Sequence, residues 1–221
     1  MSNFILKIIA IISMLCDHSG YIIFNKFSFM NYIGRLAFPI FAFSITEGYK
    51  HTKNLKKYFL RLFIFAIISQ VPYMLFLNTI DANFSLNIIF TLILGLLSIT
   101  VYTKCTNKFL GLLFIVLSGF LAHFLYFDYG WFGITVIFIF YIFKDKKFYM
   151  NLFFILSTFI NYFYMYLKTI RIEYWIIILC CSLSLLPINL YNGKKGKNMK
   201  YLFYIFYPLH LIILVLLNFI I

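Results

Sequence analysis

Residues Tyr32–Tyr73 read YIGRLAFPIFAFSITEGYKHTKNLKKYFLRLFIFAIISQVPY, and this stretch decides the fold. It contains two apolar runs, each long enough for a membrane-crossing helix, joined by a short basic loop. Arg35 lies at the start of the first run, Glu47 lies at its end, and Arg61 lies in the first turns of the second. Ionisable groups inside a membrane are energetically costly, so we expect each of them to have a function or a fixed partner.

The same apolar character continues along the whole chain. Of its 221 residues, 64% are hydrophobic and only 11% are charged, and the mean hydropathy is +0.96. Most of the apolar runs contain about 17 to 25 residues, the length that crosses a hydrocarbon layer ~30 Å thick, and the run 129–143 is shorter. They are apolar on every side, whereas the strands of a membrane barrel alternate apolar and polar residues. The sequence therefore predicts an all-α, polytopic bundle of transmembrane helices and excludes a soluble globular protein.

Polar residues separate the runs and predict nine spans. These are Asn3–Phe24, Ile33–Tyr49, Tyr58–Leu77, Phe84–Tyr102, Phe109–Leu125, Tyr129–Phe143, Phe148–Leu167, Tyr174–Leu190 and Tyr201–Ile221. The connections are short, so we expect residues 1–221 to form a single integral-membrane domain. The first run contains Asp17 and His18 and lacks a small-residue cleavage site, so we expect it to be retained rather than removed as a signal peptide.

Most of the 19 Lys and Arg residues fall on one side of the predicted membrane. That side holds Lys7, the cluster of Lys and Arg at 50–61, Lys104, Lys108, Lys144, Lys146, Lys147, Lys194, Lys195, Lys197 and Lys200; the other holds Lys26, Arg35, Lys168 and Arg171. Short loops rich in Lys and Arg stay in the cytoplasm, so the pattern predicts a multi-pass membrane protein with its N-terminus inside and its C-terminus outside. The net charge of +13 fits this topology and contact with membrane lipids or an anionic cytosolic ligand, and it does not call for nucleic acid.

The first two spans carry three candidates for chemistry. Asp17 and His18 lie about 20 Å along the first span at 1.5 Å per residue, and Arg35 enters the second span near the same outer level. Adjacent helical residues point about 100° apart, so we expect Asp17 and His18 to have separate partners. A purely structural role, with Asp17 paired to a cation such as Arg35 and His18 in one interhelical hydrogen bond, is the alternative.

The last span carries His210 about 15 Å from the basic loop, near the middle of the membrane. It follows Pro208, and Tyr207 lies on nearly the same helix face. A proline and a histidine inside an otherwise apolar span indicate the lining of a cavity. The alternative is a neutral histidine bonded to a neighbouring backbone carbonyl.

Other polar residues give weaker signals. Glu47 has Lys50 and His51 at helical spacing, so a local ion pair explains it as well as a functional role does. No soluble catalytic motif is present. The four cysteines show no paired spacing and are predicted to be small core residues; they are Cys16, Cys105, Cys180 and Cys181. The spacing of the remaining candidate metal ligands does not predict a metal site; these are Asp17, His18, Glu47 and His210.

Five segments resemble the TraX family, in the family's order and from one end of the chain to the other. They are KIIAIISMLCDHSGYIIF, IGRLAFPIFAFSITEGYKHTKNLKKYFLRLFIFAIISQVPY, LNIIFTLILGLL, DYGWFGI and LYNGKKGKNMKYLFYIFYPLHLIIL. That family is named for a conjugation protein implicated in acetylating the N-terminus of pilin. It is similar to the broader set of membrane acyltransferases that use cytosolic acetyl-CoA. The resemblance implicates Asp17 and His18 of the DH pair, Arg35 of GR, Glu47 and His51 of EGYKHT, Arg61 of RL, and His210 of YPLH.

The resulting hypothesis is acyl transfer, with acetyl-CoA as co-substrate and an amine or hydroxyl of a peptide, pilin or glycan as acceptor. His18 would be the general base, Asp17 or Arg35 would orient it or stabilise the oxyanion, and His210 would complete the cavity. The predicted cofactor-binding residues are Arg61, Lys57, His51, Glu47 and Tyr207. A proton-coupled transporter or flippase is the main alternative, and a structural partner of a secretion complex is the other.

Overall fold

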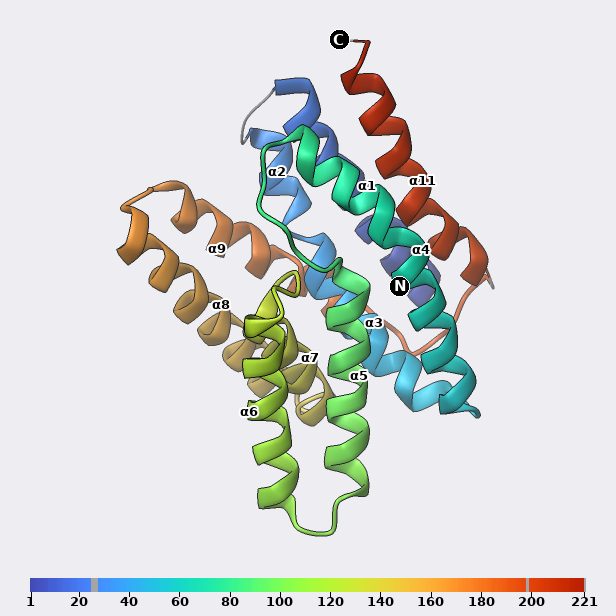
Figure 1. Ribbon diagram of the computed structural model, residues 1–221. Coiled ribbons are helices and arrows are strands. Elements are labelled where there is room, and N and C mark those ends of the chain that lie inside the picture. The colour runs from blue at the N-terminus through green and yellow to red at the C-terminus, as the bar shows by residue number, and fades with distance from the viewer. Residues whose placement is uncertain (25–27, 198, 221) are drawn as a thin grey trace. The chain divides into compact units, whose positions relative to one another are not determined.

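The computed structural model describes residues 1–24, 28–197 and 199–220. Lys26 and Ile221, both named above, lie outside these ranges. The backbone of Lys200 is described, but its side chain is not. The described residues form eleven helices and no strand, which confirms the all-α prediction (Figure 1). The helices are α1 (Asn3–Phe24), α2 (Phe29–Gly34), α3 (Ala37–His51), α4 (Leu55–Thr79), α5 (Ile88–Lys104), α6 (Lys108–Phe124), α7 (Gly130–Ile142), α8 (Lys147–Thr169), α9 (Glu173–Leu183), α10 (Leu185–Asn189) and α11 (Lys200–Asn218).

Four of these helices, α1, α4, α8 and α11, are long and apolar enough to cross a membrane. The helices α5, α6 and α7 and the segment Glu173–Asn189 are apolar but shorter. The chain therefore has the helices of an integral membrane protein. The predicted count of nine spans is not confirmed by helix length, although each predicted span overlaps a helix of the structure.

Two predicted spans are interrupted, and a proline accounts for each interruption. The span Ile33–Tyr49 is broken at Arg35 and Leu36, between α2 and α3, and the span Tyr174–Leu190 is broken at Ser184, between α9 and α10. Proline has no N–H to donate to the carbonyl four residues earlier. Pro39 thus leaves the carbonyl of Arg35 without its helical donor, and Pro187 does the same to Leu183. Each break falls where the missing hydrogen bond would have continued the helix.

The chain divides into two compact units. Unit 1 consists of Met1–Phe41, Val71–Asn83 and Thr158–Ile221, and unit 2 of Ala42–Gln70 and Phe84–Ser157. The helices α3, α4 and α8 contribute residues to both units. A single integral-membrane domain stays a prediction.

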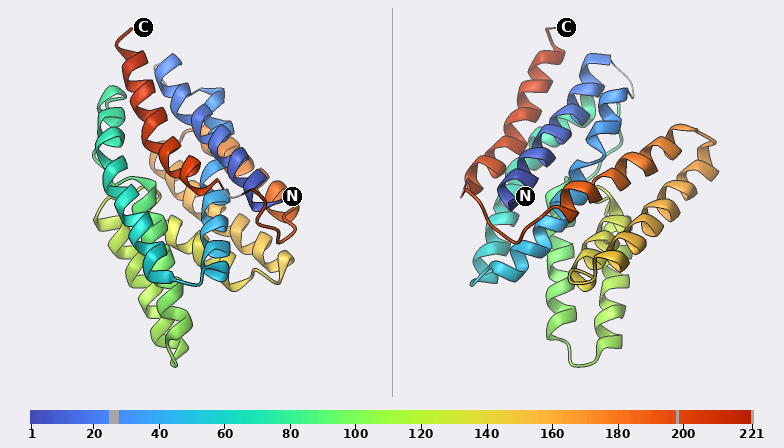
Figure 2. Two further views of the ribbon diagram at one scale, coloured as in Figure 1. Left: turned by 90° about the vertical axis from the view of Figure 1, so that its right-hand side faces the viewer. Right: turned by 180° about the vertical axis from the view of Figure 1, so that it is seen from behind.

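In unit 1, α1 packs against α2 and α11, and α2 packs against α9. Figure 2 shows α11 beside α1 when the molecule is seen from behind. The rings of Phe4 on α1 and Phe203 on α11 lie 6.2 Å apart, and both helices carry fully buried apolar residues, Leu6 and Ala10 on α1 and Leu211 on α11. Among these apolar residues, Asp17 and His18 in the C-terminal third of α1 are polar exceptions.

In unit 2, α5, α6 and α7 pack against one another (Figure 1). Their shared core includes Leu94, Ile115, Ala122 and Ile134. Gly95 lets α7 approach α5 closely, because a Cβ atom at this position would lie 2.3 Å from Cδ1 of Ile137. Unit 2 therefore has a conventional apolar core.

Large apolar side chains also cover outer surfaces of the helices. On α6 this is clearest, where the exposed residues include Phe109, Val116, Phe120 and Phe124. An apolar exterior of this extent suits contact with lipid hydrocarbon rather than water.

Candidate functional site

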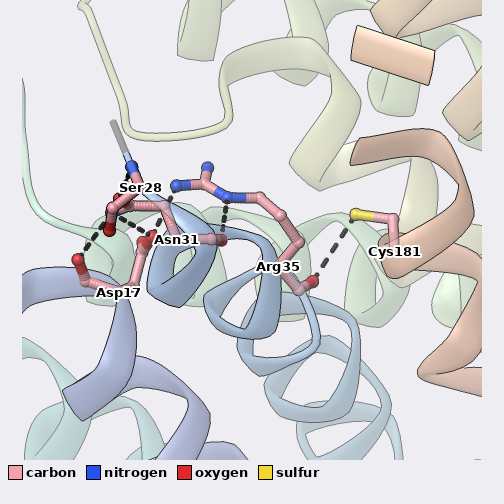
Figure 3. Close-up of polar contacts among 5 residues, drawn as sticks. All are labelled: Asp17, Ser28, Asn31, Arg35 and Cys181. Atoms are coloured by element: carbon pink, nitrogen blue, oxygen red, sulfur yellow. Dashed lines mark hydrogen bonds and ion pairs between the residues drawn. The ribbon is translucent and has the colours of Figure 1, made fainter. Parts of the chain in front are cut away.

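The ion pair between Asp17 and Arg35, which the sequence analysis gave as the structural alternative, is present in unit 1 (Figure 3). Nη2 of Arg35, in the turn between α2 and α3, lies 2.6 Å from Oδ1 of Asp17 on α1. Nε of Arg35 donates to the backbone oxygen of Asn31 at 3.1 Å, which fixes the direction of the guanidinium group. Both charged side chains are 15% exposed, so the pair lies largely inside the protein.

Asn31 of α2 completes this arrangement and was missed by the sequence reasoning. Its side chain is fully buried, and Nδ2 donates to the backbone oxygen of Asp17 at 2.7 Å and to Oδ1 of Asp17 at 3.1 Å. Its Oδ1 accepts from the backbone N–H of Ser28 at 2.7 Å. Asn31 therefore ties α2 to α1 and holds the Asp17 carboxylate for Arg35. Its position just before the predicted second span gave no signal of this role.

Gly34 explains how α2 reaches Asp17. A Cβ atom on Gly34 would lie 2.3 Å from Cβ of Asp17, far inside van der Waals contact. Only glycine permits this approach without displacing one helix. The Gly–Arg pair in the sequence is thus a local signal for the contact with α1, because the glycine brings the backbone close and the arginine follows it.

His18 has a different partner from Asp17, as the angular separation predicted. Nδ1 of His18 lies 2.8 Å from Nε2 of His210 on α11, and the two rings are nearly parallel, at 16°. Nδ1 of His210 lies 2.8 Å from the backbone oxygen of Phe206. The structure thus joins two histidines that are 192 residues apart in the chain. Among the described residues, the hydrogen-bond partner of His18 is His210 and not Asp17 or Arg35.

Aromatic rings enclose the histidine pair. The ring of Phe76 from α4 lies 4.8 Å from that of His18, and the ring of Phe206 stacks on His210 at 4.8 Å and 11°. Tyr207, predicted to bind the cofactor, lies beside His210 with ring centroids 5.8 Å apart. His210 itself is 4% exposed. The pair is therefore held in an apolar surrounding that restricts its rotation and its contact with water.

Cys181 of α9 contacts the same region through the Arg35 backbone. Its Sγ donates to the oxygen of Arg35 at 3.5 Å, which is the carbonyl that Pro39 leaves without a helical donor (Figure 3). Cys181 is 1% exposed and also hydrogen-bonds the side chain of Tyr162 of α8. The sequence predicted Cys181 as a core residue but gave no indication that it lies at the helix break.

Four of the five predicted cofactor-binding residues belong to unit 2, whereas Tyr207 belongs to unit 1. Oε2 of Glu47 lies 3.4 Å from Nε2 of His51, one helical turn further along α3, and Glu47 is buried while His51 is exposed. This contact is the local ion pair that the spacing allowed. Lys57 is exposed near the start of α4.

Arg61 lies on the next turn of α4. Its guanidinium group lies over the ring of Tyr58, 5.7 Å from the centroid. Its Nε is buried and has no hydrogen-bond partner among the residues that the structure describes. A buried guanidinium N–H without an acceptor is costly, so Arg61 is suited to accept an anionic group from outside the chain.

Three other polar residues of unit 2, Gln70, Asn87 and Thr91, have structural partners. Oε1 of Gln70 accepts from both Nδ2 of Asn87, at 2.8 Å, and the backbone N–H of Asn87, at 3.0 Å. The Thr91 hydroxyl donates to the backbone oxygen of Asp128. These contacts indicate that Gln70, Asn87 and Thr91 hold neighbouring segments together. No group of three or more metal-ligating side chains is found in residues 1–24, 28–197 and 199–220.

Comparison with known proteins gives two matches. The sequence model of the family described as TraX protein matches residues 2–218. A protein of Dichelobacter nodosus named probable fimbrial assembly protein FimC, serogroup H1, is 35% identical over 141 residues, which cover 58% of this chain and 57% of that protein. The match thus spans little more than half of that relative. No solved structure matches the chain.

Proposed function

Because the chain belongs to the TraX family, we propose that it is an acyltransferase of the bacterial cytoplasmic membrane that moves an acetyl group from acetyl-CoA to an exported acceptor. The acceptor would be an amine or hydroxyl of a peptide or glycan. Similarity to a protein named for fimbrial assembly favours a pilus subunit among these.

The observation that carries the proposal is the hydrogen-bonded pair of His18 and His210 beside the ion pair of Asp17 and Arg35. A positioned histidine can take a proton from an amine or hydroxyl as that group attacks a carbonyl. A fixed positive charge nearby can stabilise the oxyanion that develops on the carbonyl oxygen. Both elements lie within unit 1 and are supplied by α1, α11 and the turn before α3.

The proposed reaction assigns one role to each of these groups. The acceptor nitrogen or oxygen attacks the thioester carbon while His18 removes its proton, which gives a tetrahedral intermediate. The carbon–sulfur bond then breaks, and the thiolate of coenzyme A leaves and takes the proton from His18. Arg35 would stabilise the oxyanion, while Asp17 and Asn31 hold Arg35 in place.

Coenzyme A is a polyanion, so its nucleotide end requires cations. Arg61, with its unpaired buried Nε, and the exposed Lys57 are the residues we propose for its phosphates. The ion pair of Glu47 with His51 would adjust the local charge at the end of α3. Tyr207 is better explained by its contact with His210 than by direct contact with the nucleotide.

The test uses purified full-length protein in detergent with radiolabelled acetyl-CoA, without acceptor and then with a pilin N-terminal peptide. We expect labelled peptide, or slow release of labelled acetate when the peptide is omitted, from the wild type. His18→Ala should lower the rate about 100-fold or more. His123→Ala, which changes an exposed histidine of unit 2, is the matched control and should keep the wild-type rate. Equal rates in wild type and His18→Ala would contradict the proposal.

A proton-coupled transporter or flippase is the second candidate, because two hydrogen-bonded histidines, of which His210 is buried and His18 half-buried, also suit proton movement. Coenzyme A binding separates the two functions. An acyltransferase should bind coenzyme A, and Arg61→Gln should weaken that binding more than Arg171→Gln, which changes an arginine between α8 and α9. If the protein does not bind coenzyme A, and liposomes that contain the protein take up a solute in a proton-dependent way, the transporter is favoured.

A further inference from the structure

The hydrogen bonds of the histidine pair determine where its protons lie. The backbone oxygen of Phe206 only accepts hydrogen bonds, so Nδ1 of His210, 2.8 Å away, must carry a hydrogen. A neutral imidazole has one N–H, and Nε2 of His210 is therefore an acceptor. Nδ1 of His18 lies 2.8 Å from this acceptor and must donate to it. Nε2 of His18 is then left with its lone pair.

The chain of hydrogen bonds has a fixed direction because its end is part of α11. Phe206 and His210 are four residues apart in the same helix, so the carbonyl and the ring that binds it move together. Stacking of the Phe206 ring on the imidazole opposes rotation of His210. Contact with the Phe76 ring opposes rotation of His18.

Asp17 does not supply this orientation. Its Oδ1 is bound to Nη2 of Arg35 and to Nδ2 of Asn31. The arrangement thus differs from a histidine oriented by a carboxylate, since a second histidine takes the place of the acid.

On the basis of the proposed acyl transfer, we infer that Nε2 of His18 is the atom that removes the acceptor proton. His210 is the positioning residue that keeps His18 in this tautomer and shares the proton once it has been taken up.

Uptake at Nε2 gives His18 two N–H groups and a positive charge. The hydrogen on Nδ1 then passes to Nε2 of His210, which becomes the imidazolium, stabilised by the carbonyl of Phe206. The reverse movement restores the hydrogen to Nδ1 of His18 as the thiolate of coenzyme A takes the proton from Nε2. One proton enters the pair and one leaves it.

The first test does not depend on transferase activity. Nitrogen NMR of the full chain, with ¹⁵N-labelled histidine, reports which ring nitrogen carries hydrogen in each of the four histidines. His51→Gln and His123→Gln remove the signals of the two histidines outside the pair. We expect Nδ1–H and bare Nε2 for both His18 and His210 at a pH where the pair is neutral. A hydrogen on Nε2 of His18 in the neutral wild type would overturn the inference.

The second test compares two substitutions of His210. The amide oxygen of Gln can accept from Nδ1 of His18 where Nε2 of His210 does, whereas Leu cannot. We expect His210→Gln to keep kcat within about tenfold of the wild type, and His210→Leu to lose about 100-fold, with KM for acetyl-CoA unchanged in both. NMR of His210→Leu should show that His18 no longer holds its hydrogen on Nδ1 alone. Equal loss of kcat in the two variants would overturn the positioning role.

Failure of the inference and failure of the proposed function are distinguishable. If the NMR pattern is found but the wild type neither transfers acetyl nor binds coenzyme A, the acyltransferase proposal fails and the tautomer assignment stands. If transfer depends on His18 but the neutral His18 carries its hydrogen on Nε2, the function stands and the inference fails. Should His210→Leu not fold, the wild-type spectrum and His210→Gln still decide the tautomer and the hydrogen bond.

Discussion

At the scale of single residues, the site of unit 1 consists of two contacts, which are made by two adjacent residues of α1. Asp17 binds Arg35 and Asn31, and His18 binds His210. The two side chains leave the helix in different directions, so each contact connects α1 to a different element. A change at one position therefore has effects that can be separated from a change at the other.

Removal of Arg35 should destabilise the protein, and removal of both charges should restore part of the loss. Arg35→Leu leaves the largely buried carboxylate of Asp17 with the Asn31 amide alone, and breaking a buried ion pair from one side costs about 3–5 kcal/mol. Because the pair is 15% exposed, we expect about 3 kcal/mol. The double variant Asp17→Leu with Arg35→Leu leaves no uncompensated charge and should be more stable than Arg35→Leu.

Reversible unfolding in mixed detergent micelles measures both free energies. Asp81→Asn, at an exposed position with a positive φ that asparagine tolerates, is the control for loss of an acid and should change stability little. A double variant that is less stable than Arg35→Leu would contradict this account of the pair.

At the scale of helices, Gly34 and Pro39 determine how α2 contacts α1 and where the chain breaks between α2 and α3. Gly34 permits the contact between α2 and α1, and Pro39 places the break at Arg35. The break lets the side chain of Arg35 leave the turn toward Asp17 while its carbonyl accepts from Cys181.

Gly34→Ala should disturb this contact. The added Cβ would need to lie 2.3 Å from Cβ of Asp17, so α2 must move, and overpacking of this kind costs about 1–3 kcal/mol. The matched control is Gly119→Ala on α6, where the nearest atom is 3.6 Å away and alanine's higher helix propensity should give a stability equal to or above wild type. Equal free energies of unfolding for the two variants would show that an added Cβ at Gly34 does not destabilise the protein, and would contradict this prediction.

The sequence predicted the positions of the helices better than the contacts between them. Runs of apolar residues identified every long helix, because membrane-crossing length is a local property of the chain. The break at Arg35 agrees with what Pro39 predicts, because proline cannot donate to the carbonyl four residues earlier, whereas the break at Ser184 was missed although Pro187 stands at the same distance from Leu183. The contact of His18 with His210 was beyond the sequence, since it depends on packing between helices 192 residues apart.

At the scale of the whole molecule, the distribution of Lys and Arg predicts which membrane face each loop occupies. Alkaline phosphatase fused after the last residue should be active, because the C-terminus is expected outside, where the enzyme folds. The same enzyme fused after Asn54, in the basic loop before α4, should be inactive and is the control. Activity at Asn54, or inactivity at the C-terminus, would overturn the predicted orientation.

Unit 1 is assembled from three separated stretches of the chain, the last of which contains α11. During synthesis on a ribosome, His18 is made early and inserted long before its partner His210 exists. Throughout that interval His18 lacks the hydrogen-bond partner that it has in the finished structure. The histidine pair of unit 1 therefore cannot form until α11 has been released and has packed against α1, and translation itself determines when this pair is complete.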